Sequence, residues 1–380
     1  MEWKEVRLGD ILNFRRGHDL PHSAMKPGNI PVAGSNGVIG YHDTATPTKP
    51  ILTIGRSGNV GKPYFYEEAW AHNTTLYVDD FKGNDPKFLY YLCLTMPFAN
   101  YGGGSAVPTL NRKHIHPLET QIPVKVEDQR RIASILSSLD RKIELNNKIN
   151  ADLEEMAQAI FKNWFVDFEP FKDGKFVDSE LGMIPEGWKV GSLGDMGAVV
   201  CGKTPSKSNS NYYGGDIPFI KIPDMHGNVF VENSEDRLTE EGSLSQIKKL
   251  IPPYSLMVSC IATVGLVSIN TKSSHTNQQI NTVIPHNKSA LFYLYQHIKN
   301  NEELLKNMGR GGTTTLNVNT KSFSNIRLLI PTETTLERFN EIVEGLFKKI
   351  ELNMQESRTL SLLRDTLLPR LMSGELEIPE

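Results

Sequence analysis

The sequence predicts an α+β fold. Two globules of mixed α/β structure are separated by two long antiparallel coiled-coil helices, and the whole is a pseudo-two-fold internal repeat. Three observations predict it: a long stretch free of Pro and Gly, a second copy of that stretch near the end, and repeated words in the segments before each copy. At 380 residues the chain exceeds what one core accommodates and suits two domains with connectors.

The first long helix is predicted at 127–163. Apolar residues recur there at spacings of three, four, six and seven, a pattern typical of a helix that packs along a partner helix. A helix of this length is roughly 55 Å long. The predicted apolar seam consists of Ile132, Leu136, Leu139, Ile143, Ile149, Leu153, Met156 and Ile160.

The second long helix repeats the first. The word KIELN at 142–146 returns 207 residues later at 349–353. Asn146 and Asn353 each fall near the middle of a helix, so an antiparallel pair would bring them to the same level. A buried pair of asparagines would fix the register at some cost in stability; the alternative is that both lie at the edge of the seam in water. The second seam is predicted to contain Phe339, Ile342, Leu346, Ile350, Leu360, Leu363 and Leu367.

Repeated words also mark the globules. Trp3-Lys4 returns 185 residues later as Trp188-Lys189, and Ile122-Pro123 returns 208 residues later as Ile330-Pro331. The rising offset places insertions in the globules, while the helices stay aligned. Two copies of one unit predict the single-chain analogue of an isologous dimer. The predicted parts are a first globule at 1–126, a helix at 127–163, a connector at 164–187, a second globule at 188–332, and a helix with its tail at 333–380.

Short β-rich runs and turn residues predict the content of the globules. We expect strands at 51–54, 75–78, 256–259 and 264–269, and helices at 86–94 and 289–306.

Composition excludes several classes of protein. The formal charge of −3 gives no general indication of nucleic acid, although a local basic face would suffice to bind it. The scattered Cys93, Cys201 and Cys260 suit a reducing cytoplasm and neither a disulfide framework nor a zinc site. The start of the chain has no signal-peptide pattern, and no apolar run is long enough for a membrane span.

Four patterns resemble catalytic motifs and fail. The IPPY run at 251–254 lacks the hydrogen-bond acceptor that amino-methyltransferases need in its first position. The loop at 55–62 is one residue too long for a phosphate loop and carries Pro63 in place of Ser or Thr. His18 and His22 are separated by Pro21 and have no third ligand, and no further acid joins the acidic pair at 79–80. We therefore predict neither a catalytic centre nor a metal site.

Polar and basic loops remain. Arg, Asn and Gln can read base edges bidentately, and Lys, Ser and Thr suit phosphate, although exposed loops are polar in any protein. We take Asn73 and Asn277, 204 residues apart, to occupy matching places. The residues expected to contact DNA are Arg15, Arg16, Arg56, Ser57, Asn59, Asn73, Thr74, Arg112 and Lys113 in the first globule, and Lys203, Lys207, Tyr212, Asn277, Gln278, Arg310, Thr313 and Thr314 in the second.

Five words make the resemblance to one family specific, and it covers essentially the whole chain. They are DQRRIA at 128–133, KIELN at 142–146, NWFVDF at 163–168, GMIPEGW at 182–188 and LPRLMSG at 368–374. With these words the chain resembles the specificity (S) subunit of type I restriction–modification enzymes. The departure is at the start, because no Ile-Pro-Glu-Gly precedes Trp3.

The resemblance implies a recognition subunit without an active site. Each globule would be a target recognition domain that reads one half of a bipartite site in double-stranded DNA. The helices would set the spacing and dock two methyltransferase (M) subunits, with restriction/translocase (R) subunits joining through the complex. S-adenosylmethionine, ATP and magnesium would be used by the partners, with no cofactor on this chain and no membrane contact.

Two other readings stay open. One is an orphan DNA-binding regulator of the same fold, which would have no methyltransferase partner. The other is a DNA-modifying enzyme with an unrecognised site, which would turn over S-adenosylmethionine without partners.

Overall fold

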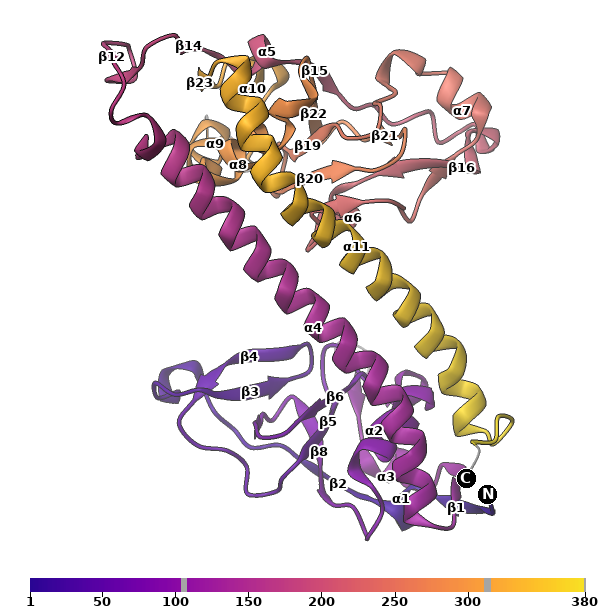
Figure 1. Ribbon diagram of the computed structural model, residues 1–380. Helices are drawn as coiled ribbons and strands as arrows, with labels where there is room; N and C mark the ends of the chain where they lie inside the picture. The colour runs from indigo at the N-terminus through magenta and orange to yellow at the C-terminus, as the bar shows by residue number, and fades with distance from the viewer. Residues whose placement is uncertain (104–107, 311–315, 379–380) are drawn as a thin grey trace. The chain divides into compact units, whose positions relative to one another are not determined.

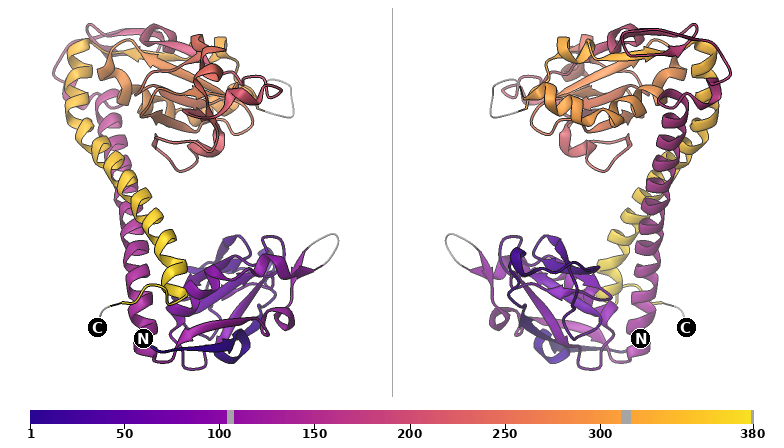
Figure 2. Two further views of the ribbon diagram at one scale, coloured as in Figure 1. Left: turned by 90° about the vertical axis from the view of Figure 1, so that its right-hand side faces the viewer. Right: turned by 90° about the vertical axis from the view of Figure 1, so that its left-hand side faces the viewer.

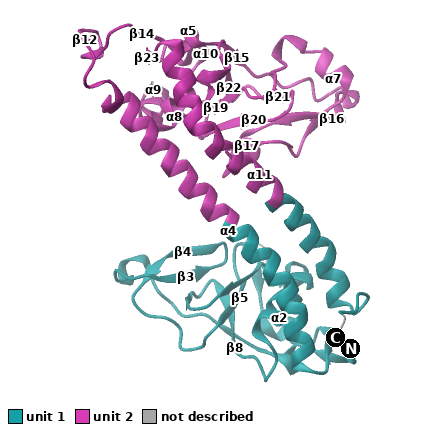
Figure 3. Ribbon diagram, in the orientation of Figure 1, with its two compact units in different colours: residues 1–145, 357–380 teal, residues 146–356 magenta. Residues whose placement is uncertain are grey.

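A computed structural model describes residues 1–103, 108–310 and 316–378. The chain divides into two compact units (Figures 1 and 3). Unit 1 comprises Met1–Leu145 and Ser357–Glu380, and unit 2 comprises Asn146–Glu356. The two long helices, α4 (Val126–Phe165) and α11 (Glu333–Met372), pass through both units, so each unit holds one globule and part of each helix. None of the described helices is both long and apolar enough to cross a bilayer.

The first globule consists of short strands, two helices of a single turn and one longer helix, α2. Its helices are α1 (Leu8–Ile11), α2 (Pro86–Thr95) and α3 (Arg112–Ile115). Its strands are β1 (Trp3–Arg7), β2 (Asn13–Arg16), β3 (Ile30–Gly34), β4 (Gly37–His42), β5 (Ile51–Gly55), β6 (Pro63–Tyr66), β7 (Trp70–Ala71), β8 (Thr75–Asp80), β9 (Gly102–Gly103), β10 (Thr109–Leu110) and β11 (Glu119–Pro123).

The second globule and the connector before it contain the remaining elements. The helices are α5 (Leu193–Met196), α6 (Ile222–Met225), α7 (Glu240–Leu244), α8 (Leu291–Asn300), α9 (Glu302–Gly309) and α10 (Thr320–Ser324). The strands are β12 (Phe176–Val177), β13 (Ile184–Pro185), β14 (Lys189–Ser192), β15 (Gly197–Cys201), β16 (Tyr213–Ile220), β17 (Phe230–Val231), β18 (Arg237–Leu238), β19 (Leu256–Ser259), β20 (Val267–Asn270), β21 (His275–Thr276), β22 (Ile280–Pro285) and β23 (Arg327–Ile330).

Sheet topology confirms the internal repeat. The order β2-β8-β5-β6 in the first globule matches β15-β22-β19-β20 in the second, and β4-β3-β7 matches β18-β16-β21. In each three-stranded sheet the last pair is parallel. The antiparallel pair β1–β11 matches β14–β23, and each pair joins the start of a globule to the strand before its long helix. The second globule adds β17, which extends the larger sheet beside β20.

The two long helices are antiparallel, as predicted. Within unit 2, Asn146 of α4 donates to the Asn353 backbone oxygen (3.4 Å) and to Glu356 (2.9 Å). Farther along α4, Phe161 packs on Phe339 near the start of α11. Figure 2 shows the helices side by side within each unit.

The two asparagines predicted to pair are close and buried, but the 3.4 Å bond between them joins the Asn146 side chain to the backbone oxygen of Asn353 and not to its side-chain amide. Asn146 is 0% and Asn353 is 1% exposed. Asn353 instead donates from its side chain to Asn150 Oδ1 (2.9 Å), one turn along α4. The buried amides therefore form a short ladder that links the helices through several polar atoms.

In unit 1 a polar cluster ties the helices to the first globule. Arg364 of α11 donates to Asp140 of α4 (2.8 Å), and Tyr91 of α2 donates to the other oxygen of the same carboxylate (2.5 Å). Burial and the neighbouring Asp140 charge raise the pKa of Tyr91 well above its ordinary value, so the hydroxyl stays a donor.

Three predicted seam residues are wrong. Met156, Ile342 and Leu363 are 52%, 47% and 44% exposed. A strict heptad seam assumes that each helix packs only against its partner helix, but both helices also pack on the globules. In unit 2, α4 places Ala157 and Phe161 in the core of the second globule, and in unit 1, α11 places Leu371 and Met372 in the core of the first. The buried stripe of α11 on the second globule consists of Leu336, Phe339, Val343, Phe347 and Ile350.

Two other predicted elements need correction. The helix expected at 289–306 is divided into α8 and α9, because Asn301 leaves helical geometry between them. The strand expected at 264–269 begins later, at Val267, because Gly265 has a φ of +100° and belongs to the preceding turn. The other strands and the helix expected at 86–94 are confirmed.

Candidate nucleic-acid interface

Both globules contain the same backbone corner. In it, the residues that follow one strand (β2 or β15) pack on the turn before the neighbouring strand (β8 or β22). In the first globule, Gly17 N donates to Thr75 O (3.0 Å) and His18 N to Ala71 O (2.8 Å). A Cβ on Gly17 would lie 2.1 Å from the His72 carbonyl oxygen, so only glycine allows this approach.

The second globule repeats this corner bond for bond. Gly202 N donates to Ile280 O (3.1 Å) and Lys203 N to Thr276 O (2.9 Å). A Cβ on Gly202 would lie 2.1 Å from the Asn277 carbonyl oxygen. The two glycines are 185 residues apart and their hydrogen-bond partners are 205 residues apart, so the offset between the two copies differs from one side of the corner to the other.

This geometry corrects one correspondence. The expectation that Asn73 matches Asn277 is wrong by one residue: His72 lies where Asn277 lies, and Asn73 corresponds to Gln278. An offset judged from identical letters cannot reveal a shift of one residue, whereas paired hydrogen bonds fix it.

Each matching amide bonds the residue two places after the glycine. Asn73 donates from Nδ2 to Asp19, and Thr204 donates to Gln278 Oε1 (2.6 Å). Asp19 and Thr204 were not predicted as site residues, although they are 185 residues apart, the same offset that separates Trp3 from Trp188. The two contacts occupy the same place in the two globules, but the amide donates the hydrogen bond in the first and accepts it in the second.

Arginines predicted from the sequence gather around one cavity in the first globule. It measures about 390 Å³ and is lined by Arg15, Arg16, Arg56, Leu76, Thr109, Leu110, Asn111 and Arg112. The guanidinium groups are held only in part: Arg15 pairs with Asp79 at 3.2 Å and Arg112 donates to Phe14 O at 3.1 Å. Because each guanidinium has five N–H donors, most remain available to phosphate or to a guanine edge.

The backbone brings the other predicted residues of this globule to the same place. Ser57 N donates to Thr74 O (3.2 Å), and Leu110 N donates to Arg56 O (2.8 Å), so three loops converge. Asn59 is exposed at the tip of the 55–62 turn, and Lys113 is exposed in the first turn of α3. The turn closes through Gly61 N to Gly55 O (2.8 Å), which fits a turn and not a phosphate loop.

A half-buried histidine lies beneath this surface. His116 Nε2 accepts from Phe14 N (3.1 Å), and its ring stacks on that of Phe14. Burial first, then the Arg112 and Lys82 charges, lower the pKa of His116. The neutral ring can therefore act as an acceptor that ties β2 to the segment after α3.

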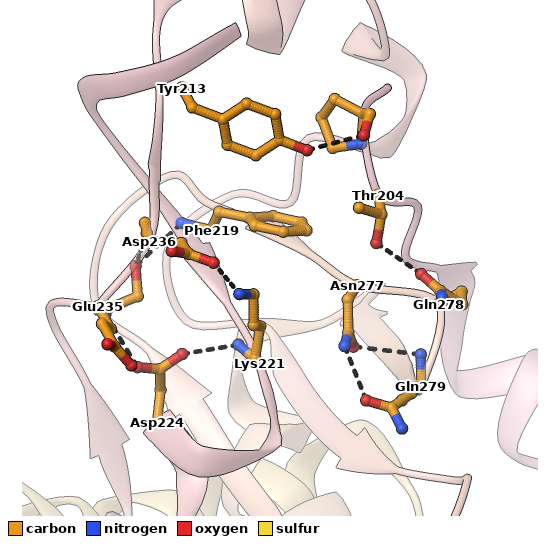
Figure 4. Close-up of polar contacts among 12 residues, drawn as sticks. Thr204, Tyr213, Phe219, Lys221, Asp224, Glu235, Asp236, Asn277, Gln278 and Gln279 are labelled. Carbon is orange, nitrogen blue, oxygen red and sulfur yellow. Dashed lines mark hydrogen bonds and ion pairs between the residues drawn. The ribbon is translucent and has the colours of Figure 1, made fainter. Parts of the chain in front are cut away.

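The corner in the second globule presents Lys203 together with the amides and the hydroxyl drawn in Figure 4. Gln278 and Lys203 are exposed beside Thr204, whose contact with Gln278 the figure shows. Asn277 is 8% exposed and bonds Gln279 twice, through the Gln279 amide N and side chain (3.2 and 2.9 Å). Its side chain holds the turn together in this structure, and a base contact by Asn277 stays a prediction.

The remaining predicted residues of the second globule are more scattered. Lys207 is exposed, and Tyr212 is half-buried, with its backbone oxygen accepting from Thr239 N (3.0 Å). Arg310 is exposed after α9 and donates to Asn307 Oδ1 (2.9 Å). Thr313 and Thr314 lie outside the described residues. No cluster of three or more His, Cys, Asp or Glu suited to a metal occurs in the described part of the chain.

Two cavities at matching places lie where each globule meets the helix that follows it. In unit 1 a cavity of about 860 Å³ is lined by Arg141 and Glu144 of α4. In unit 2 a cavity of about 750 Å³ is lined by Lys348 and Glu351 of α11, the residues 207 positions later. The repeat therefore extends from the folds to the surface features beside the helices.

Comparisons with known proteins agree on one family. The family model described as "Type I restriction modification DNA specificity domain" matches residues 1–155 and 185–361. The type I restriction enzyme HindI specificity subunit of Haemophilus influenzae is 34% identical over 98% of this chain and 94% of its own. The MjaIX specificity subunit of Methanocaldococcus jannaschii is 32% identical over 77% of this chain and 70% of its own.

A solved structure shows the same fold. The S subunit of a type I restriction–modification system from M. genitalium superposes with a TM-score of 0.64 at 14% identity, covering 100% of this chain and 97% of its own. The family model, the full-length similarity to a curated relative and the repeated corner together lead to one conclusion: the chain belongs to the family of type I restriction–modification DNA specificity subunits.

Proposed function

We propose that this chain is the non-catalytic DNA-recognition subunit of a type I restriction–modification complex. Residues 1–126 and 188–332 are the target recognition domains, and each reads one half of a bipartite site. The observation that carries this is the repeated corner, where one backbone presents different hydrogen-bonding side chains, Asn73 with Asp19 and Gln278 with Thr204. Side chains that differ on a common frame suit two different DNA words.

The test is a map of methylated adenines in cells that contain or lack this chain, with the partner methyltransferase subunits present in both. We expect methylation of a two-part site only when the chain is present. Methylation that persists unchanged without the chain would overturn the proposal.

The helical regions 127–163 and 333–380 are, in this proposal, the ruler between the half-sites and the dock for two M subunits. Two features of the helices are present in both units and support two identical partners. One is a cavity, lined by Arg141 in unit 1 and by Lys348 in unit 2; the other is an exposed leucine, Leu145 at 51% and Leu352 at 48% exposure. A single exposed leucine is ordinary, but Leu145 and Leu352 are separated by the 207-residue offset of the helices, as two identical docking surfaces would require.

Co-purification tests the docking. Leu145→Asp with Leu352→Asp should lower the yield of bound M subunit more than either change alone. Val177→Asp is the matched control, because Val177 is a partly exposed apolar residue on β12 outside the helices. An unchanged yield of M subunit with the double variant would place the dock elsewhere.

The chemistry belongs to the partners in this proposal. Methyl transfer would use S-adenosylmethionine on the M subunits, and cleavage would use ATP and magnesium on R subunits, in the cytoplasm where the DNA lies. The purified chain given DNA and S-adenosylmethionine should show no turnover, and turnover by the chain alone would favour a DNA-modifying enzyme instead.

A further inference from the structure

The matching amides Asn73 and Gln278 have partners of different chemistry. Asp19 is a carboxylate and can only accept, so Asn73 must turn its NH2 group toward it. Arg16 also donates to the same Asp19 oxygen (3.3 Å). The orientation of the Asn73 amide is therefore fixed by charge.

The Gln278 amide is not fixed in that way. Its partner Thr204 donates here, but a hydroxyl can also accept, so the amide can turn over and keep its bond. The residue at the position of Arg16 is Cys201, whose Sγ lies 3.8 Å from the Gln278 backbone oxygen and adds no charge. Two orientations are thus compatible with the second corner.

After bonding its partner, Asn73 keeps one N–H and its carbonyl oxygen, and Gln278 keeps both N–H groups and one oxygen lone pair, so each amide still offers a donor and an acceptor. That pair is what reads a base edge bidentately in the major groove, as with adenine N6 and N7. Reversing the amide exchanges the positions of donor and acceptor, and with them the base pair that fits. Asn73 is half-buried and Gln278 exposed, so both can reach a ligand at the surface.

We propose that Asp19 and Thr204 are positioning residues that set how strictly each globule reads one base pair. Asp19 holds Asn73 in a single orientation, so the first globule accepts one base pair at that position. Thr204 lets Gln278 adopt either orientation, so the second globule accepts two. This rests on the proposed function, because it assigns a base to side chains of the same interface.

The test exchanges the two partners and reads the methylated sites in cells that carry the M subunits. Asp19→Thr should broaden one position of one half-word, with discrimination against the second base pair falling about tenfold. Thr204→Asp should narrow one position of the other half-word, because a carboxylate admits only one orientation of Gln278. All other positions of both words should stay as they are.

Glu5→Gln is the matched control, because Glu5 is an exposed carboxylate on β1 of the same globule, and it should change neither word. Absence of methylation with the unaltered chain would instead refute the proposed function. Methylation that keeps the original base frequencies in both exchange variants would overturn the inference alone. If Asp19→Thr lowers the melting temperature and abolishes methylation, the test rests on Thr204→Asp. A second half-word that still accepts two base pairs at that position in the Thr204→Asp variant then refutes the inference.

Discussion

The two globules share a backbone and differ in the side chains that it carries. The first surrounds its corner with Arg15, Arg16, Arg56 and Arg112, and the second presents Lys203 and the amide of Gln278. The shared part is built from strand pairing and a glycine that no other residue can replace without movement. The difference teaches that the corner is a frame and that its side chains can change without altering the fold.

The largest expected effect tests whether the frame is shared. Gly17→Ala and Gly202→Ala each place a Cβ 2.1 Å from a carbonyl oxygen, so the backbone must move. We expect each change to lower the free energy of unfolding by about 3 kcal/mol, measured by chemical denaturation. Gly103→Ala is the control, since its Cβ would meet nothing within 4 Å. A large loss in one globule and none in the other would show that the corners are not equivalent.

The second prediction uses a buried histidine in the second globule. His275 is 0% exposed, bonds Ser243 through Nε2 (2.8 Å), and burial lowers its pKa to about 4. An unfolded histidine has a pKa of ~6.5, so as pH falls the unfolded chain takes up a proton that the folded chain does not. Stability is therefore complete above pH ~6.5 and declines until pH ~4.

By pH 5 the loss from His275 amounts to about 2 kcal/mol. Hydrogen exchange at pH 7 and pH 5 should show protection lost around His275 in the wild type, and His275→Gln should have a smaller difference between the two pH values. Equal pH dependence in the variant and the wild type would refute this assignment.

The third prediction separates the two readers. Arg56→Ala should weaken recognition of one half-word by about 2 kcal/mol, and Gln278→Ala or Arg310→Ala should weaken only the other. Binding of the assembled complex to DNA altered in one half-site at a time measures this. Equal losses for both half-sites with a single variant would contradict independent reading.

The smallest expected effect concerns the amide ladder in the helices of unit 2. Asn146→Leu with Asn353→Leu replaces two buried amides by apolar groups and leaves Asn150 and Glu356 to find other partners. We expect thermal stability to stay the same or rise by about 1 kcal/mol, while the helix register loosens. A clear loss of stability, measured by thermal melting, would mean that the ladder stabilises the helices and does more than align them.

The sequence predicts the repeat and the antiparallel helices, and it singles out all four arginines that line the cavity of the first globule. It does so because periodicity and repeated words are local signals, and those signals survive without knowledge of packing. The exposure of Met156 and Ile342 could not be predicted from the sequence, because the face of a helix that is buried depends on the globule that packs on it. Asp19 and Thr204 were missed because their role lies in contacts with residues 54 and 74 positions away.

The central claim is that two globules read separate words while the helices set the gap between them. Inserting one heptad between Leu139 and Leu153, with a matching heptad in the second helix, keeps the apolar seam and lengthens each helix by about 10 Å, near three base-pair rises. Sequencing of methylated DNA from cells with this variant should show the same two words separated by a longer gap. The original gap between the same words would contradict the account.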